Sequence, residues 1–277
     1  IISLVDESNA MPIELPFETK LISDDEFHAI DHQVMGMVFA IHNDLGRLLG
    51  ERIYQNELAY QCRKAGFEKV ATEVPIKISH KDFEKFLFID LLLNDAVIYE
   101  LKTVAALTGE HQQQTLNYLF LLGMQHGKLV NLRPPSVESR FVSTRLTAEK
   151  RHQYVIEDQL WHELDDDSIW LKQFVIDLLN DWGAFLDTAL YCDAINHFRG
   201  GKTNVVKRVK VVSGARVLGK QKANLLNSEV AYSISSKTKD DKFYERHLHK
   251  FIQHTTLKAI QWINFNHDHI QFKTVFR

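Results

Sequence analysis

Apolar residues recur at helical spacing in two segments near the start of the chain. Over Asp24–Leu49 they stand three and four positions apart, which predicts a long amphipathic helix capped by Asp24 or Asp25. A second helix is expected over Glu51–Ala65, closing at Gly66, because glycine suits the end of a helix. The pattern therefore predicts two consecutive helices.

Runs of β-branched and aromatic residues follow and predict a sheet. The expected strands cover Val74–Ile78, Phe83–Leu93 and Ala96–Val104. Asn94-Asp95 offers turn chemistry between the last two strands, which we therefore interpret as a hairpin. Helical composition returns over Glu110–Met124, and a short buried strand is expected over Lys128–Leu132. The first unit is expected to end near residue 147.

The second half begins with a polar stretch, residues 148–175, which we interpret as a helical connector. Further on, residues 199–222 carry eight Lys or Arg residues and no Asp or Glu. This is the strongest charge asymmetry in the chain, and it suits a phosphate backbone. The candidate nucleic-acid-binding residues within it are Lys207, Arg208, Lys210, Arg216, Lys220 and Lys222. A solvated hairpin is the alternative interpretation.

The two halves of the chain repeat each other at nearly constant spacing. The matched positions are Asn43–Gly46 with Asn180–Gly183 and Tyr54 with Tyr191 at a shift of 137 (191 − 54), then Leu92–Asn94 with Leu225–Asn227 and Asn131 with Asn264 at a shift of 133 (264 − 131). Chance similarity of short patterns is the alternative, but it does not account for a shift that holds from the hairpin to Asn264. The pattern predicts a tandem duplication.

Composition narrows the class of protein. A chain of 277 residues exceeds the usual size of one domain, and 45% hydrophobic with 25% charged residues is typical of a globular protein without a membrane span. Cys62 and Cys192 cannot build a disulfide framework, so we expect a cytoplasmic protein. The net charge of −3 neither favours nor excludes nucleic acid. Residues 8–10, directly before Met11, resemble the remnant of a cleaved tag, so we expect residues 1–10 to have no part in the function.

The predicted hairpin carries three charged residues at an informative spacing. If its turn centres near Asp95, residues whose numbers sum to 190 lie opposite each other, so Asp90 faces Glu100 with Cβ atoms roughly 4.5–5.5 Å apart. Two carboxylates this close repel unless a cation or a proton lies between them. Lys102 shares the face of Glu100, and the Leu101 carbonyl offers a further oxygen. Such hard oxygen ligands suit Mg²⁺ or Mn²⁺.

An alternative is that Asp90 caps a strand end while Glu100 and Lys102 form a solvated edge pair. The residues around them are strongly apolar, however, which predicts a buried hairpin. Charges without partners are costly in such a place. We therefore expect these charges to have a function.

Asp90, then Glu100-Leu101-Lys102, then the segment Gln114–Tyr118 resemble the PD-(D/E)XK nuclease superfamily, including the Gln-x-x-x-Tyr element of its RecB-like and lambda-exonuclease-like branches. The upstream segment Glu51–Tyr54 is similar to the bacterial GxxExxY family of that superfamily. The first glycine of that family's motif is Leu48 here, so the helix entry is expected to differ. The resemblance covers about residues 28–145.

This resemblance implies an α/β, restriction-endonuclease-like core in which helices flank a mixed central sheet. It also implies a nuclease that uses Mg²⁺ or Mn²⁺. DNA is the expected substrate in preference to RNA, and the sequence leaves RNA open as the alternative. The implied metal ligands are Asp90, Glu100, the Leu101 carbonyl and Glu51, and the other implied catalytic residues are Lys102, Gln114 and Tyr118. A solvated Glu51 and a core Tyr118 stay open as alternatives.

The second copy lacks the reactive residues. In it, Asp90 corresponds to Ala223, Glu100 to Ser233, Lys102 to Ser235, Glu51 to Thr188, Gln114 to His247 and Tyr118 to Phe251. We therefore expect a nuclease-like domain over residues 11–147 and a degenerate, inactive repeat over residues 176–277.

Several functions and assemblies stay open on the sequence alone. The repeat allows either an internal pseudo-dimer or a homodimer. Besides a metal-dependent nuclease, the pattern allows a non-catalytic nucleic-acid-binding or interaction module, or a platform that only docks proteins.

Overall fold

The structure, a computed structural model, describes residues 12–239 and 241–277, so the expected tag remnant at residues 1–10 lies outside the described residues. The chain divides into two units, and the boundary falls between Ala148 and Glu149. Within the described residues, none of the helices combines the length and the apolar character that crossing a bilayer requires.

The helices of unit 1 are α1 (Asp24–Leu45), α2 (Glu51–Lys64) and α3 (Gly109–Leu122). Ser23 caps α1, where Asp24 or Asp25 was expected. Its hydroxyl accepts a hydrogen bond from the Glu26 backbone N–H at 3.3 Å, while the Glu26 carboxylate accepts one from the Ser23 N–H at 2.9 Å. This reciprocal pair needs a Glu three residues after the cap, and only Ser23 has one there.

The strands of unit 1 are β1 (Ile13–Glu14), β2 (Val70–His80), β3 (Phe83–Leu93), β4 (Val97–Lys102), β5 (His126–Asn131) and β6 (Glu138–Ser143). They form one sheet in sequential order, β1 to β6. All neighbours are antiparallel except β4 and β5, which are parallel and joined through α3. Unit 1 is therefore a mixed sheet flanked by helices, as the family resemblance implies.

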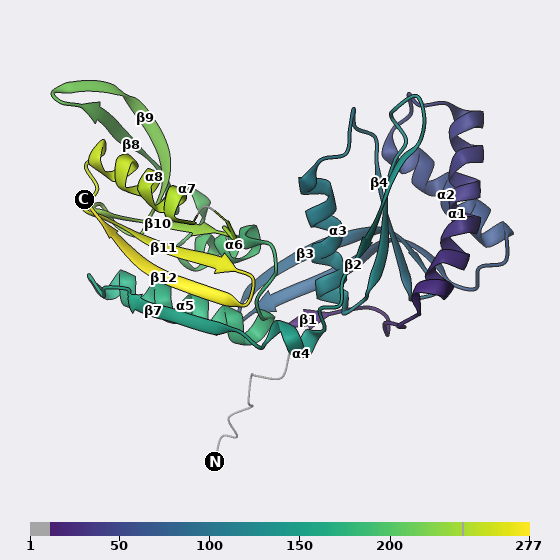
Figure 1. Cartoon of the computed structure of the whole chain (residues 1–277), viewed down its shortest axis with the longest axis horizontal. Helices are drawn as coiled ribbons and strands as arrows, with labels where there is room; N and C mark the ends of the chain where they lie inside the picture. The colour runs from purple at the N-terminus through teal and green to yellow at the C-terminus, as the bar shows by residue number, and fades with distance from the viewer. Residues whose placement is uncertain (1–11, 240) are drawn as a thin grey trace, which may run out of the picture. The chain divides into compact units, whose positions relative to one another are not determined.

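Helices cover both faces of this sheet, with α1 and α2 on one side and α3 on the other (Figure 1). The buried cluster on the first face joins α1 and α2 to Leu91 of β3 and to Tyr99 and Leu101 of β4. Side chains alternate along a strand, so Asp90 and Glu100 point to the opposite face, the one that α3 covers. This placement sets the position of the candidate site.

The helices of unit 2 are α4 (Ala148–Arg151, at the boundary), α5 (Asp166–Trp182), α6 (Thr188–Phe198), α7 (Lys202–Val205) and α8 (Asp241–Gln253). Its strands are β7 (Val155–Leu160), β8 (Val206–Ser213), β9 (Arg216–Leu225), β10 (Val230–Ser235), β11 (Ala259–Asn266) and β12 (His269–Phe276), in the sheet order β7-β12-β11-β10-β9-β8.

The prediction that residues 148–175 form a helical connector is wrong. This segment contains β7, which pairs in parallel with β12 at the edge of the second sheet, and the start of α5. As an edge strand β7 is partly exposed and polar, so its sequence lacks the apolar alternation of a half-buried strand. The second unit thus begins earlier than residue 176.

Both units share the topology of five strands, β2 to β6 in unit 1 and β8 to β12 in unit 2, whereas β1 pairs with β2 at one edge and β7 pairs with β12 at the opposite edge. In unit 1, two helices precede β2, β3 and β4, and α3 then leads to β5 and β6; in unit 2, α5 and α6 precede β8, β9 and β10, and α8 leads to β11 and β12. The parallel pair lies at the same place, between β4 and β5 and between β10 and β11. The repeat seen in the sequence thus has a counterpart in strand order.

Equivalent polar side chains also make equivalent hydrogen bonds. The Asn131 amide donates to the Val104 carbonyl at 2.9 Å and its oxygen accepts from the Val104 N–H at 3.1 Å. The Asn264 amide makes the same two bonds with Lys237, at 2.9 and 2.8 Å. Both shifts equal 133 (264 − 131 and 237 − 104). A buried asparagine therefore fixes the segment that follows β4 in unit 1 and the segment that follows β10 in unit 2.

Candidate active site

The β3–β4 hairpin has the register that the sequence predicts. Leu91 lies opposite Tyr99 and Leu93 opposite Val97, and both pairs of numbers sum to 190. The turn is compact because Asn94 and Asp95 adopt positive φ angles of 53° and 55°, which these residue types tolerate better than most.

Asp90, Glu100 and Lys102 converge at the end of this hairpin. The ammonium of Lys102 donates to a Glu100 carboxylate oxygen, Oε1, at 2.6 Å and lies 4.0 Å from Oδ2 of Asp90. The same Asp90 oxygen accepts a hydrogen bond from the Leu101 N–H at 2.7 Å. The side chains of Asp90 and Glu100 are only 16% and 2% exposed. Three charged groups therefore lie close together on the sheet with little exposure to water.

The two carboxyl groups are poorly suited to carrying charge at the same time. Burial raises the pKa of Asp90 to about 6, against the Leu101 hydrogen bond and the Lys102 charge, while the charges of Glu51 and Glu73 add to the rise. Burial, followed by the charge of Asp90, raises the pKa of Glu100 to about 8. Near neutral pH one proton is therefore retained unless a cation takes its place.

Lys102 supplies one positive charge, but it does not satisfy both carboxylates. Burial acts to lower the pKa of Lys102, yet the charge of Glu100 and the hydrogen bond to it outweigh burial, so the pKa rises and the ammonium stays charged. The second Glu100 oxygen, Oε2, is buried and has no hydrogen-bond partner. A buried carboxylate oxygen without a donor is costly. Such an oxygen fits the ligand set of a divalent cation.

Glu51 does not join the two carboxylates as a third ligand in this structure. Within residues 12–239 and 241–277, no group of three or more His, Cys, Asp or Glu side chains is placed to hold a metal ion. Glu51 begins α2, which packs on the opposite face of the sheet. Its charge nevertheless acts on Asp90, Glu100 and Lys102. The acidic side chains brought together are thus two carboxylates, and Leu101 contributes its backbone N–H to Asp90.

Gln114 and Tyr118 lie on α3, one turn apart, on the helix that covers this face. The Gln114 amide donates to the Tyr118 hydroxyl at 3.0 Å, and Tyr118 is 5% exposed. Burial, followed by the charge of Glu100, raises the pKa of Tyr118 to about 12. The hydroxyl is therefore neutral at physiological pH and keeps its proton for donation.

Sequence reasoning missed Gln55 and Glu73. The buried Gln55 amide of α2 donates to the Asp90 backbone carbonyl at 2.6 Å and to the Glu73 carboxylate at 2.7 Å. Glu73 sits at an irregular point of β2, with a positive φ of 51°, between the pairs Thr72 with Leu91 and Val74 with Ile89. The sequence does contain one sign of this contact. Glu73 is a charged residue directly before Val74, where the strand was expected to start.

Neutral residues fill the corresponding place in unit 2. The Trp262 indole donates to the Ser235 hydroxyl at 2.9 Å, and the Ser233 and Tyr244 hydroxyls lie 3.0 Å apart. Ala223 lies on β9 and Thr188 begins α6, while His247 and Phe251 lie on α8. These hydroxyl and indole groups hydrogen-bond with one another, and the ammonium groups of Lys237 and Lys273 lie 5.5 and 5.4 Å from the centres of the Tyr244 and Trp262 rings. Positive charge therefore already lies beside this cluster.

The six candidate nucleic-acid-binding residues lie on one hairpin. Lys207, Arg208 and Lys210 belong to β8, and Arg216, Lys220 and Lys222 belong to β9. All six are exposed. The structure thus brings them together on neighbouring strands of unit 2.

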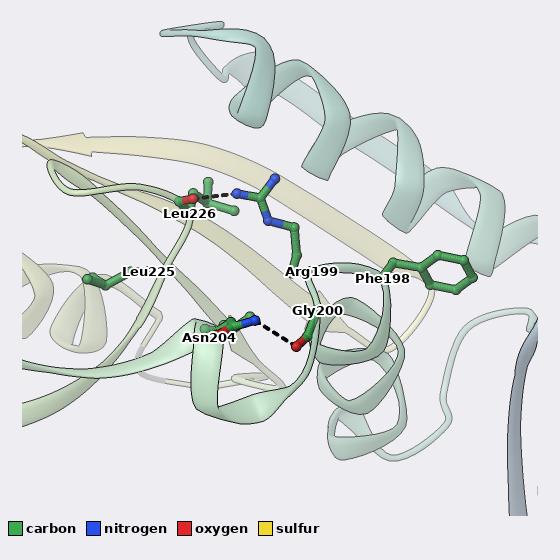
Figure 2. A pocket seen from close by; sticks show the side chains of 7 residues that line it. Phe198, Arg199, Gly200, Asn204, Leu225 and Leu226 are labelled. Carbon is green, nitrogen blue, oxygen red and sulfur yellow. Dashed lines mark hydrogen bonds between the residues drawn. The ribbon is translucent and has the colours of Figure 1, made fainter.

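Unit 2 also contains a cavity of about 460 Å³, and no predicted site residue lines it. Figure 2 shows its Arg199 guanidinium directed at the Leu226 carbonyl, to which it donates at 2.5 Å, and the Asn204 amide directed at the Gly200 carbonyl, to which it donates at 2.7 Å. Arg199 also pairs with Asp167 at 2.6 Å. These polar groups are used within the protein, so the cavity offers no chemistry comparable with that of unit 1.

Comparison with known proteins identifies the kind of fold that holds the site. Residues 28–142 match the family model described as the PD-(D/E)XK nuclease superfamily. The matched segment lies within unit 1 and includes Asp90, Glu100, Lys102, Gln114 and Tyr118. No curated protein and no solved structure matched the chain.

Proposed function

We propose that unit 1, whose residues 28–142 match a nuclease superfamily, is a metal-dependent phosphodiesterase that cleaves nucleic acid, DNA rather than RNA. The observation that carries this proposal is the convergence of Asp90, Glu100 and Lys102 on one buried face, with the Lys102 ammonium 2.6 Å from Glu100. We further assign the unit to the GxxExxY branch, on its Glu51–Tyr54 segment.

Asp90 and Glu100, with the Leu101 carbonyl, would hold Mg²⁺ or Mn²⁺. The fit rests on the buried Glu100 oxygen that has no donor and on the raised pKa of both carboxyl groups. A divalent ion, when bound, activates water and offsets the negative charge that develops at phosphorus. The charge of Glu51 contributes to the raised pKa of Glu100 in this centre.

Lys102 provides a fixed positive charge beside the same carboxylates. Its position is set by the hydrogen bond to Glu100, and its side chain is 13% exposed, so little water screens it. A charge placed in advance in a poorly solvated site stabilises a developing negative charge more strongly than it does in water. We assign Lys102 this role toward the scissile phosphate.

Gln114 and Tyr118 orient the substrate from α3. The Tyr118 hydroxyl accepts the hydrogen bond from Gln114, which leaves its own proton for a phosphate oxygen. Because the pKa of Tyr118 is raised to about 12, that proton is retained over the whole physiological range. The pair thus acts as a neutral donor next to two carboxylates.

Unit 2 is, in this proposal, a degenerate copy that arose by duplication. The shared strand order and the matching asparagine hydrogen bonds support common ancestry. Ala223, Ser233 and Ser235 stand where Asp90, Glu100 and Lys102 would be needed, so unit 2 binds no metal in this way.

Cleavage assays with purified full-length protein test the assignment. Single- and double-stranded DNA and RNA are incubated with Mg²⁺ or Mn²⁺, and Asp90→Asn is compared with the wild type. Asparagine keeps an oxygen for the Leu101 N–H but loses the charge, so cleavage should fall at least about a hundredfold while the fold persists. Ser233→Ala, in the corresponding region of unit 2, should cleave like the wild type.

Full activity of Asp90→Asn would show that the site is misassigned. Salt-dependent DNA binding without turnover under any divalent cation would instead favour a non-catalytic nucleic-acid-binding module.

A further inference from the structure

The β8–β9 hairpin stands largely apart from the sheet of unit 2. Only Asn224 and Leu225, at the end of β9, pair with β10. The remaining strand pairing of β8 and β9 is with each other, and they form a two-stranded ribbon, drawn in green in Figure 1. Val212 also links the ribbon to the segment after α8, since its N–H donates to the His254 carbonyl at 2.7 Å. Most of this ribbon is exposed, including every residue from Arg216 to Lys222. It therefore presents a long surface outside the core.

Four cations occupy one face of this ribbon in two directly opposed pairs. Arg208 lies opposite Lys222, and Lys210 lies opposite Lys220. Because side chains alternate along a strand, these four share a face. The other face carries Val209, which is 8% exposed and belongs to the buried cluster beneath α8. The cationic face is therefore the one turned away from the core.

Like charges directly opposite each other destabilise a pair of strands. No Asp or Glu occurs between residues 199 and 222 to offset them. In the part of the chain that the structure describes, none of the four cations forms an ion pair with a carboxylate. The ribbon thus keeps a repulsive arrangement that folding alone does not require.

The corresponding hairpin of unit 1, β2–β3, has a lysine whose charge is balanced by carboxylates. There Lys77 of β2 pairs with Glu84 of β3 at 2.8 Å and with Glu14 of β1 at 3.3 Å. The same supersecondary element therefore carries its own counter-charges in one unit and lacks them in the other. The missing counter-charge of β8–β9 indicates an external anion with repeated charges.

We propose that the Arg208, Lys210, Lys220 and Lys222 face binds the phosphate backbone of B-form duplex DNA, which makes double-stranded DNA the substrate class of the nuclease proposed above. The major groove of B-form DNA is about 12 Å wide and admits a two-stranded ribbon, so cations on a ribbon can reach its phosphate walls. The major groove of A-form RNA is too narrow for this. The contact neutralises phosphates and releases counterions, so it carries no sequence preference of its own.

The substitution Lys220→Glu should have opposite effects on the stability of the ribbon and on its affinity for DNA. Opposite Lys210, a glutamate turns a repulsive pair into an ion pair, so thermal stability should be unchanged or higher. The same change places a negative charge on the DNA-binding face. The affinity for duplex DNA should fall on the order of tenfold, with a shallower dependence on salt. Lys64→Glu, on an exposed position of α2, changes the net charge equally and serves as the control.

Fluorescence anisotropy with a labelled B-form duplex, in EDTA and between about 50 and 200 mM salt, measures this binding without cleavage. The proposal is overturned if Lys220→Glu binds like Lys64→Glu, or if duplex RNA of the same length binds as tightly as DNA. It is also overturned if vesicles of phosphatidylserine and phosphatidylcholine bind in place of DNA, an outcome that the exposed Val217 and Leu218 near the end of the ribbon would then explain.

Cleavage is scored separately with Mg²⁺. Ribbon-dependent binding without any cleavage contradicts the nuclease assignment alone. Cleavage with unchanged binding by Lys220→Glu contradicts the ribbon assignment alone.

Discussion

Replacing Glu100 with glutamine should remove a pH dependence from the stability of unit 1 when divalent metals are absent. In the folded protein, burial, followed by the charge of Asp90, raises the pKa of Glu100 from 4.5 to about 8. A group whose pKa is raised on folding stabilises the fold fully below its unfolded pKa, and this stability is lost as the pH rises through the folded pKa. Wild-type unit 1 should therefore weaken between about pH 4.5 and pH 8.

The magnitude follows from the size of the shift. One pKa unit corresponds to about 1.4 kcal/mol, so a rise from 4.5 to about 8 corresponds to on the order of 5 kcal/mol across this range. Glutamine keeps the shape of Glu100 but cannot ionise. Glu100→Gln should match the wild type at pH 5, where Glu100 is protonated, and exceed its stability at pH 8.

Hydrogen–deuterium exchange of the β3 and β4 amides in EDTA, corrected at each pH for the intrinsic exchange rate, measures this difference. All four tryptophans, Trp161, Trp170, Trp182 and Trp262, lie in unit 2, so their fluorescence during urea unfolding follows the unit that should not change. Glu84→Gln, at a half-exposed carboxylate of β3, is the matched control. If Glu100→Gln lost protection in parallel with the wild type from pH 5 to pH 8, the reasoning would be refuted.

Two further substitutions test the packing around the site by the same exchange measurement. Gln55→Leu should destabilise unit 1 by about 1–3 kcal/mol and slow cleavage, because the buried Asp90 carbonyl and the Glu73 carboxylate both lose their donor. Gly127→Ala should destabilise it by about 1–3 kcal/mol, because a Cβ there would lie 2.8 Å from Cγ1 of Ile98.

Each of these substitutions has a control in the same unit. Gln61 donates to Glu57 on the same helix at 2.9 Å, so Gln61→Leu should change stability much less than Gln55→Leu. Gly109 has no atom within 4 Å of an added Cβ, so Gly109→Ala should be tolerated. Equal losses in a variant and its control would mean that the named contacts are not responsible.

The hairpin that carries the site was predictable because its determinants are local. The Asn94-Asp95 turn fixed the register, and the alternation of side chains fixed the common face of Asp90 and Glu100. The partnership of Lys102 with Glu100 followed from their spacing of two residues. A short segment thus contained enough information to place the central charges.

Long-range contacts were beyond the sequence pattern. Gln55 reaches Asp90 across 35 positions, and Glu73 depends on an irregularity in β2 that a run of strand-forming residues does not reveal. The strand β7 was missed for a similar reason, since it pairs with β12, more than a hundred positions away. Its polar edge position removed the alternation that identifies internal strands.

The structure of a manganese-soaked crystal of the full-length protein is the most direct test of the proposed metal centre. We predict an anomalous signal within coordination distance of Asp90, Glu100 and the Leu101 carbonyl, with no equivalent signal near Ser233. The signal should be lost in Asp90→Asn. Manganese bound elsewhere in unit 1, with Asp90 and Glu100 unchanged, would contradict the claim that these two carboxylates hold the ion.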